Sequence, residues 1–435
     1  MRDPLGRIEV HDKTVVRKLG QPLSGDHFLN TPLARELVKQ GKLIDFTFDD
    51  ANTLQHPRIA FVTHPYEWCN EQFMQAAELT LEIAERIASE GFELKDASAW
   101  NILFDGGRPV FCDHLSFQKI QTPQWWAFGQ FIRHFILPMV VQQHCGLLAQ
   151  DVFKIHRDGL NPQTARHMLG ARRWLTRYWP LMLESKTPSN AKAAGTASTD
   201  KSRHQGLYAS TRWFLNGLKK SGAAQTSNWV DYTQTRSHYS DHDSQQKAQI
   251  VRRWLEQIQP TWVTDLGCNT GEFSFMAHEV GAKVVSVDLD HESIQKLHNN
   301  IHGKSIYSVV ANLDDLVAGR GWAGHEVPGL LQRLNGKADA VLVLALVHHL
   351  AISSSIPYEE IAALTAQLTR RYAIVELLHL QDPLVQHLAA QRQRSTEDFA
   401  LERQLKAFEL HFKCLDRLPL DNGLRELVLF EKTEP

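Results

Sequence analysis

The sequence predicts an α/β protein with more than one domain, and three observations lead to this prediction. Residues 263–273, VTDLGCNTGEF, read as a strand that passes through two glycines into the start of a helix. Residues 283–290, KVVSVDLD, read as a second strand, and an acid ends it about 20 residues after the glycines. The chain has 435 residues, more than a single hydrophobic core usually holds.

The glycine segment indicates a nucleotide site at the edge of a parallel sheet. Asp265 ends the strand, and Gly267 and Gly271 lack the side chains that would keep a ligand away from the backbone. Asp288 ends the second strand, where ribose hydroxyls need a carboxylate. An NAD-type fold is the nearest competitor, but its third glycine is absent at the required spacing. The alternative without a ligand is a tight turn between strand and helix.

The segment from about Trp229 to Lys432 resembles the class I S-adenosylmethionine-dependent methyltransferases, with DLGCNTG as its glycine motif. The resemblance implies a Rossmann-like seven-stranded sheet and S-adenosyl-L-methionine as cofactor. Tyr239, which precedes the first strand, is expected either to cover the cofactor or to belong to the core. The expected cofactor-binding residues are Asp265, Gly267, Asn269, Gly271, Asp288, Asn312 and Leu313.

Catalytic candidates follow two later strands. Residues 338–346, ADAVLVLAL, read as a buried strand that leads into His348 and His349, at the edge where these enzymes place the transferred methyl group. Either imidazole is a candidate general base, since imidazole titrates near neutral pH, and the alternative is that one of them only packs or caps the loop. Glu376, at the end of the next strand, is a third candidate, although many such carboxylates are merely solvated. Nothing in this half requires a metal.

A second unit of motifs lies in the N-terminal part. Asp96 is followed five residues later by Asn101, then by a short strand, a glycine hairpin and a strand that ends in Asp113. The unit resembles that of protein kinases and aminoglycoside-type phosphotransferases, preceded by a helix from about Phe73 to Ser89. The resemblance implies a reduced α+β kinase-like domain in which Asp96 takes the hydroxyl proton and Asn101 and Asp113 hold Mg-ATP.

This N-terminal pattern also departs from the kinases. Leu94 and Lys95 stand before the first Asp in place of the usual His-Arg or His-Gly pair, and no glycine-rich phosphate loop precedes the first long helix. Arg17 or Lys18 is the candidate for the strand cation that reaches the phosphates, with Glu36 as its partner. The alternative is a hairpin whose Asp and Asn cap turns, as these residues often do.

Composition divides the chain in the middle. Residues 186–225 include a stretch rich in Ser, Ala, Thr, Lys, Asn and Gly, which predicts a linker and a mixed segment. The expected domains are therefore a kinase-like substrate or ATP domain at 1–185, the linker at 186–225 and the methyltransferase at 226–435. A helix is expected from about Gln245 to Ile258, directly before the first strand of the methyltransferase sheet.

Charge and cysteine content narrow the class of protein. The net charge of −2 shows no excess of basic residues of the kind that binds phosphates, so a small-molecule or glycan acceptor is favoured over nucleic acid. The five cysteines lie far apart without a CxxC pair, which argues against a zinc site or a disulfide framework. The N-terminus lacks the apolar run of a secretory signal, and no segment is long and apolar enough to span a bilayer. We therefore expect a cytoplasmic protein.

Nearly the whole chain resembles a bacterial family of class I methyltransferases, some of them called nodulation-type proteins. The segments that carry this resemblance include Leu94 to Asn101, Asp113 to Phe117 and Leu344 to Leu350. It implies a methyltransferase for an unidentified acceptor, which the N-terminal domain helps to bind. Two alternatives stay open: a bifunctional kinase and methyltransferase that modifies a sugar or glycolipid, and a binding scaffold without turnover.

Overall fold

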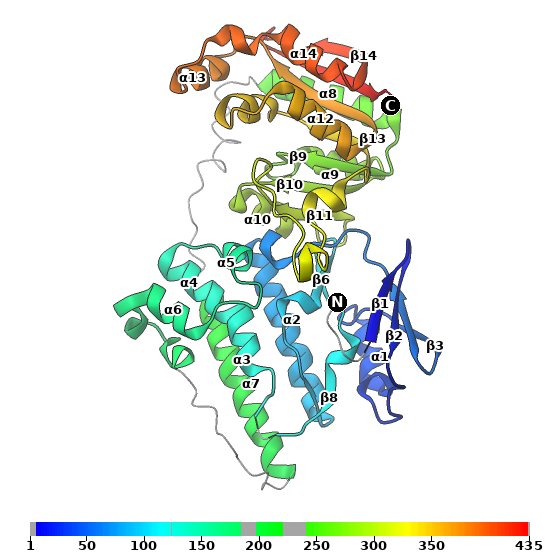
Figure 1. Cartoon of the computed structure of the whole chain (residues 1–435), viewed down its shortest axis with the longest axis vertical. Helices are drawn as coiled ribbons and strands as arrows, with labels where there is room; N and C mark the ends of the chain where they lie inside the picture. The colour runs from blue at the N-terminus through cyan, green and yellow to red at the C-terminus, as the bar shows by residue number, and fades with distance from the viewer. Residues whose placement is uncertain (1–5, 123, 184–196, 221–240, 434–435) are drawn as a thin grey trace. The chain divides into compact units, whose positions relative to one another are not determined.

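The computed structural model describes residues 6–122, 124–183, 197–220 and 241–433. The chain forms two compact units, Met1–Ala224 and Gln225–Pro435. Tyr239 lies outside the described residues. Each unit is described by itself below, with the helices and strands labelled as in Figure 1.

The N-terminal unit begins with a four-stranded antiparallel sheet in the order β1-β2-β4-β3. Burial alternates along β2, where Val15, Arg17 and Leu19 are buried and the residues between them are more exposed. Helix α1 lies between β2 and β3 in the sequence, and the Thr31 side chain caps it by accepting from the backbone N–H of Ala34. The bounds are β1 Gly6–Val10, β2 Thr14–Leu19, α1 Pro32–Lys39, β3 Thr47–Asp50 and β4 Thr53–Pro57.

The rest of this unit is built around a long helix, α2 (Asn70–Ser89), whose apolar residues recur at helical spacing and are buried. Two short antiparallel pairs follow: β5 (Phe92–Leu94) with β8 (Phe117–Lys119), and β6 (Ile102–Asp105) with β7 (Arg108–Phe111). The second pair is the hairpin that the sequence predicts. The remaining helices are α3 Phe128–Phe131, α4 Leu137–Cys145, α5 Ala149–Ile155, α6 Pro162–Leu169 and α7 Ala197–Lys220, with a π-helix at Ile132–Ile136 between α3 and α4.

Helix α7 departs from the linker expected at 186–225. It packs against α2, where the Arg212 guanidinium forms a two-pronged ion pair with Glu85. Tyr208 is buried against Trp125, with 5.1 Å between the ring centroids. The sequence of this segment is polar because its exposed face is wide, but a stripe that includes Tyr208, Leu215 and Leu218 is buried. Residues 204–219 therefore belong to the folded N-terminal unit.

The C-terminal unit contains a seven-stranded sheet in the order β11-β10-β9-β12-β13-β15-β14, which has the number of strands that the sequence predicts. The first five strands of this order are parallel, and β15 is antiparallel to both of its neighbours. The bounds are β9 Trp262–Leu266, β10 Lys283–Asp288, β11 Ile306–Val310, β12 Ala338–Val343, β13 Thr369–Leu378, β14 Phe412–Pro419 and β15 Arg425–Lys432.

The strand order reverses between β9 and β12. From β9 the chain moves outward to β10 and β11, and it then returns to place β12 on the other side of β9. Because parallel crossovers are right-handed, this reversal puts the connecting helices on opposite faces and opens a crevice at the carboxyl ends of the two strands. The helices are α8 Asp241–Ile258, α9 Glu272–Glu279, α10 His291–Asn299, α11 Leu330–Leu334, α12 Tyr358–Leu368, α13 Pro383–Gln391 and α14 Leu401–Glu409.

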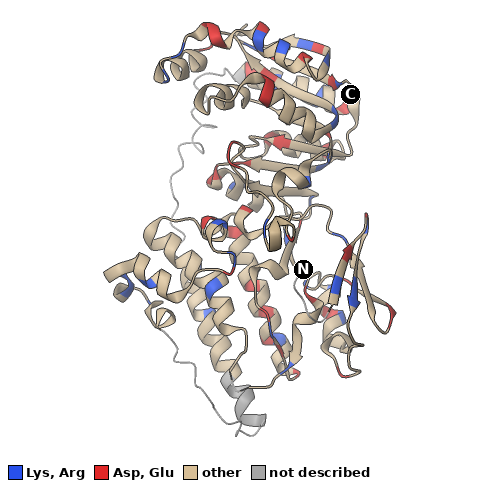
Figure 2. Cartoon of the chain, in the orientation of Figure 1, with Lys and Arg blue, Asp and Glu red and all other residues tan. Residues whose placement is uncertain are grey.

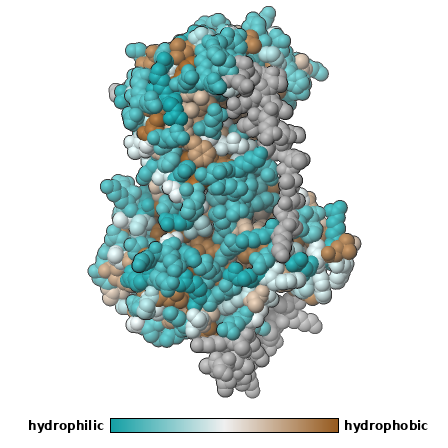
Figure 3. Space-filling model, turned by 180° about the vertical axis from the view of Figure 1, so that it is seen from behind, coloured by the Kyte–Doolittle hydropathy of each residue, from teal (hydrophilic) through white to brown (hydrophobic). Residues whose placement is uncertain are grey.

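The surface of both units is mixed in charge and mainly polar. Acidic and basic residues are interspersed along the ribbons of Figure 2. Figure 3 shows a predominantly hydrophilic surface that hydrophobic residues interrupt in places. Among the described residues, no helix combines the length and apolar character needed to cross a membrane.

Candidate functional site

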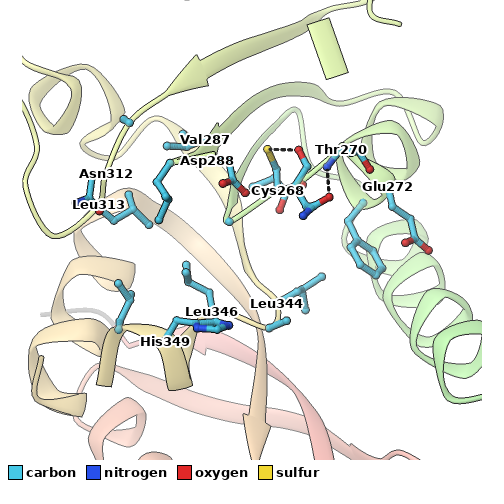
Figure 4. Close-up of a pocket in the computed structure, with 18 of the residues that line it drawn as sticks. Cys268, Thr270, Glu272, Val287, Asp288, Asn312, Leu313, Leu344, Leu346 and His349 are labelled. Atoms are coloured by element: carbon cyan, nitrogen blue, oxygen red, sulfur yellow. Dashed lines mark hydrogen bonds between the residues drawn. The ribbon is translucent and has the colours of Figure 1, made fainter. Parts of the chain in front are cut away.

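The reversal of strand order in the C-terminal unit coincides with a cavity of about 260 Å³. Its walls come from the ends of β9 and β10, from the residues that follow β9, β10, β11 and β12, and from α8 and α9. Figure 4 shows part of this lining. Ligands of open α/β sheets bind in this crevice, outside the carboxyl ends of the strands. The lining residues are Ser244, Lys247, Asp265, Gly267, Cys268, Asn269, Thr270, Glu272, Phe273, Val287, Asp288, Leu289, Ala311, Asn312, Leu313, Asp314, Leu344, Ala345, Leu346, His349, Leu350, Ser353 and Ser354.

The glycine turn after β9 has a backbone that side chains would disturb. Gly267 and Gly271 have φ values of 70° and 90°, in the region that favours glycine. A Cβ at Gly267 would lie 3.3 Å from the Leu346 side chain, and a Cβ at Gly271 would lie 2.4 Å from that of Leu297. Gly267 lines the cavity, whereas Gly271 caps the start of α9 and is not among the lining residues. The two glycines therefore differ in what they permit. Gly267 leaves the cavity wall without a side chain, and Gly271 lets the start of α9 pack closely against Leu297.

Asp288 ends β10 and faces the cavity (Figure 4). Its two carboxylate oxygens accept backbone N–H groups, from Asn269 at 2.7 Å and from Asp290 at 2.8 Å. Burial raises the pKa of Asp288, and these two hydrogen bonds oppose that shift. Each carboxylate oxygen has a second lone pair, so the group can still accept hydroxyl groups of a ligand.

Asp265 also lines the cavity, but it is hydrogen-bonded within the protein. The Ser274 hydroxyl donates to Asp265 Oδ2 at 2.6 Å, and Ser286 donates to the Ser274 hydroxyl at 2.7 Å. Burial raises the pKa of Asp265 to about 7, and the Ser274 hydrogen bond acts against this rise. This chain of hydroxyls ties the end of β9 to α9 and β10, which fixes the geometry of the glycine turn.

The side of the cavity beyond Asp288 is apolar. Leu289 is 56% exposed although it is a large hydrophobic residue, and it lines the cavity together with Leu313 and Asn312. The predicted cofactor residues Asn312 and Leu313 thus lie in the loop after β11, on the same side as Asp288 in Figure 4. An exposed leucine beside a carboxylate suits a ligand with a flat apolar part next to a hydroxyl-bearing part.

His349 faces these residues across the cavity, beside Leu346 (Figure 4). It begins a π-helix, His349–Ser353, which directly follows the loop after β12. Burial, aided by the charge of Arg425, lowers the pKa of His349 to about 4. The imidazole is therefore neutral at pH 7 and can donate one hydrogen bond and accept another.

His348 lies behind the cavity wall and differs in this respect from the sequence expectation. Its side chain is buried and is not among the lining residues, and its ring centroid lies 4.2 Å from that of His349. Burial lowers its pKa well below that of a free imidazole. Neither ring nitrogen has a hydrogen-bond partner among the described residues. His348 therefore packs against His349, outside the residues that line this cavity.

Glu376 is likewise placed behind the cavity, in a buried ion cluster that the sequence did not predict. Its Oε2 accepts from Lys247 Nζ at 2.5 Å and from the backbone N–H of Ala345 at 2.8 Å, and its Oε1 accepts from Arg425 at 3.3 Å. Arg425 also donates to Asp382 at 2.7 Å. Ala345 has φ of 53°, a strained conformation for a residue with a Cβ. Glu376 thus holds the backbone of the loop that follows β12.

Lys247 and Phe273 are cavity residues that the sequence analysis missed. Lys247 is buried on α8, and its ammonium lies 5.1 Å from the centre of the Phe273 ring. A lysine in a polar amphipathic helix reads as a solvated residue, so its residue type did not distinguish Lys247. Its position could have done so, because α8 directly precedes β9 and the buried stripe of α8 must reach the sheet.

In the N-terminal unit, Asp96 follows β5, Asn101 directly precedes β6, and Asp113 follows β7. Asn101 donates through its side chain to the backbone carbonyl of Asp96 at 3.3 Å. Asp96 Oδ1 accepts the backbone N–H of Ser98 at 3.0 Å. Burial, with a smaller contribution from the charge of Asp113, raises the pKa of Asp96.

The strand cation near these acids is Arg17, not Lys18. Arg17 is buried and donates to Asp113 Oδ1 at 3.1 Å. Lys18 points to the surface and pairs with Glu9, with 2.9 Å between Nζ and Oε1. The expected partner Glu36 pairs instead with Arg86, at 2.7 Å.

The expectation that this unit holds Mg-ATP gains no support from these contacts. Arg17 already neutralises Asp113, and within the described ranges no group of three or more His, Cys, Asp or Glu side chains could hold a metal ion. The kinase-like character of the unit stays a prediction.

Comparison with known proteins gives one relative over the whole chain and several partial structural likenesses. No family model matches the chain. It is 27% identical over 458 residues to nodulation protein NoeA of Rhizobium meliloti (strain 1021), covering 100% of this chain and 95% of that protein. N-methyltransferase NodS from Bradyrhizobium japonicum WM9 is similar at 9% identity and a TM-score of 0.33, over 45% of this chain and 99% of NodS. Magnesium protoporphyrin IX methyltransferase (ChlM) from Synechocystis PCC 6803, with bound SAH, is similar at 15% identity and a TM-score of 0.33, over 51% of this chain and 94% of ChlM.

Proposed function

We propose that the protein is an S-adenosylmethionine-dependent methyltransferase that acts on an unidentified acceptor. The observation that carries the proposal is the cavity at the reversal of strand order, where the Gly267 turn and the Asp288 carboxylate face the same space. We assign methyl transfer to residues 226–435 and give the N-terminal domain the task of helping to bind the acceptor.

The lining of the cavity fits the parts of the methyl donor. Asp288 would accept the ribose hydroxyls, since its oxygens keep lone pairs beyond those that the backbone uses. Leu289 and Leu313 would cover the adenine ring, and Asn312 would contact its polar edge. Gly267 lines the cavity without a side chain, so the methionyl part would lie against its backbone. When bound, the sulfonium supplies an electrophilic methyl group.

The chain's own contribution to the reaction is positioning. Leu346 and Leu350 line the cavity together with His349 and would help to exclude water from a bound donor and acceptor. A neutral His349 would accept a hydrogen bond from an acceptor O–H or N–H and so align its lone pair. His348 and Glu376 would act through His349 and Ala345, which they contact, and not on the substrate.

Two alternatives would give different results. The bifunctional kinase and methyltransferase gains no specific support from the ion pair of Arg17 with Asp113. The non-catalytic scaffold would bind the methyl donor without ever producing S-adenosylhomocysteine. A small molecule or glycan remains the acceptor class that we propose, since acidic and basic residues are mixed over both units (Figure 2).

Isothermal calorimetry on the full chain with S-adenosylmethionine tests the proposal. We expect saturable binding that Gly267→Arg abolishes, because the new side chain would enter the cavity. Gly281→Arg is the matched control: its φ of 101° is also positive, but no atom lies within 4 Å of its Cβ position and it does not line the cavity. Equal binding by wild type and Gly267→Arg, or no binding by wild type, would overturn the proposal.

A further inference from the structure

The N-terminal unit contains a second cavity, next to Asp96, that the methyltransferase proposal does not use. It measures about 350 Å³ and lies beside the antiparallel pair of β5 and β8. Asp96 directly follows β5, and Gln118 lies on β8. Its lining residues are Lys95, Asp96, Gln118, Gln121, Trp126 and Gln130.

One fully buried carboxylate, that of Glu93, organises the wall of this cavity. Glu93 Oε1 accepts from the Gln118 side chain at 3.0 Å and from the backbone N–H of Gln121 at 3.4 Å. Its Oε2 accepts from the backbone N–H of Trp126 at 3.1 Å. A buried carboxylate is stable only when donors surround it, and here the donors come from three lining residues. The cavity wall is therefore held in place from behind.

The opposite side of the cavity is fixed in a similar way. Gln130 Oε1 accepts the backbone N–H of Ala97 at 2.8 Å, which orients the Gln130 amide beside Asp96. The Ser116 hydroxyl donates to the backbone carbonyl of Asp96 at 2.8 Å and accepts its N–H at 3.1 Å. These bonds fix the backbone on both sides of the Asp96 carboxylate, so the cavity is preorganised and its polar groups point from rigid positions.

The chemistry of the lining selects a neutral ligand rich in hydroxyl groups. The charges of Lys95 and Asp96 balance, and the other polar side chains are three carboxamides, which both donate and accept. Trp126 is 63% exposed, so its indole presents an apolar face beside these polar groups. A sugar ring has this combination, with hydroxyls at its edge and C–H groups on its face. A nucleotide would bring several negative charges to a wall with a single cation.

We propose that this cavity binds a sugar residue, with Trp126 against the ring face and Asp96, Gln118 and Gln130 hydrogen-bonded to its hydroxyls. The proposal stands apart from methyl transfer, because it rests on residues of the N-terminal unit alone. It assigns a ligand class to this unit without requiring phosphoryl transfer.

Saturation-transfer NMR on the full chain tests this binding, with D-glucose, D-mannose, D-galactose, L-fucose and N-acetyl-D-glucosamine as separate probes. We expect transfer to at least one of them, reduced about fivefold in Trp126→Ala, which removes the ring face. Gln118→Ala should weaken the same signal, since it removes a donor and acceptor. Trp174→Ala is the matched control, because Trp174 belongs to the same unit and is 57% exposed but lies outside the cavity.

Three results would overturn the proposal. One is the absence of transfer from all five sugars to a wild type that is folded by circular dichroism. Another is an equal signal in Trp126→Ala and Trp174→Ala. The last is binding of Mg-ATP that Trp126→Ala abolishes while no sugar binds, which would make the cavity a nucleotide site. The sugar signal should persist in Gly267→Arg, so failure of the methyltransferase proposal and failure of this one are distinguishable.

Discussion

Both units bring a carboxylate to the turn after a strand, but they neutralise it in different ways. Asp288 in the C-terminal unit is held by two backbone N–H groups and faces a cavity. Asp113 in the N-terminal unit is paired with the buried guanidinium of Arg17. Backbone donors leave the negative charge and its remaining lone pairs for a ligand, whereas a guanidinium cancels the charge. Two aspartates in similar motifs thus differ in their capacity to bind a ligand, because one is held by backbone N–H groups and the other by a guanidinium.

The largest expected effect concerns the cations near the cavity of the C-terminal unit. Lys247 and Arg425 are both buried, and both pair with Glu376. Glu376→Gln should lower the free energy of unfolding of this unit by about 3–5 kcal/mol, because it leaves two buried cations without their shared anion. Hydrogen exchange of β13 peptides along a urea titration measures this unit separately from the other.

The control for that variant is Glu431→Gln, which removes a more exposed carboxylate whose partner Arg371 is itself exposed. An exposed ion pair contributes about 0–1 kcal/mol, so this variant should unfold near the wild-type midpoint. If Glu376→Gln behaved like the control, the pairs of Glu376 with Lys247 and Arg425 would not contribute to the stability of this unit as proposed.

Replacing Asp288 tests the functional half of the comparison. Asp288→Ala should weaken binding of S-adenosylmethionine by about 10- to 150-fold, which corresponds to losing one hydrogen bond to a charged group at about 1.5–3 kcal/mol. Calorimetry measures the affinity. Asp315→Ala, an exposed acid outside the cavity, should bind like wild type. Unchanged affinity in Asp288→Ala would mean that the carboxylate does not contact the donor.

Replacing Asp113 tests the other side of the comparison, in which the carboxylate stabilises the fold through its pair with Arg17. Asp113→Ala takes the carboxylate from Arg17 and should lower the stability of the N-terminal unit by about 1.5–3 kcal/mol. Its affinity for S-adenosylmethionine should stay at the wild-type value. Hydrogen exchange of β2 and β7 peptides measures the stability of the N-terminal unit, and calorimetry measures the affinity for S-adenosylmethionine. Loss of methyl-donor binding without loss of stability would reverse the contrast between Asp113 and Asp288.

The smallest expected effect is a pH dependence that comes from His349. Burial lowers its folded pKa to about 4, so the unfolded chain binds the proton first when the pH falls below about 6.5. Its contribution to stability is therefore full above pH 6.5 and is lost progressively between pH 6.5 and 4. When the pH falls from 7 to 5.5, the free energy of unfolding of His349→Gln should decrease by about 1 kcal/mol less than that of the wild type. The exposed His387→Gln is the control and should follow wild type.

The sequence predicted the parts of the fold that local pattern determines. The β-branched strands at 263–266 and 283–288, and the hairpin between Asn101 and Asp113, are present where they were expected. It did not predict that α7 packs on α2, because a polar helix with a narrow buried stripe has the composition of a linker. Composition reports average polarity, and packing depends on which few residues share a face.

The residues of the candidate site also fall into two groups, those that local sequence pattern indicates and those that depend on packing. Asp288 and His349 line the cavity because strand ends in a parallel sheet converge on one edge, which spacing alone can indicate. His348 and Glu376 share the same sequence neighbourhoods but point behind the wall, and this depends on side-chain direction. Lys247 and Glu93 carry no motif at all. Their importance comes from partners more than 20 residues away in the chain.

The π-helix that starts at His349 limits how this region can change during evolution. Each of its turns contains one residue more than an α-helical turn, and the surplus lies within the five residues 349–353. Deleting Ala351 or Ile352 would restore α-helical winding and rotate the following side chains by about 100° about the axis. Leu350 and Ser353 would then be two positions apart and would lie on different sides of the helix. Substitutions can therefore accumulate in this segment among homologues, whereas insertions and deletions should be rare.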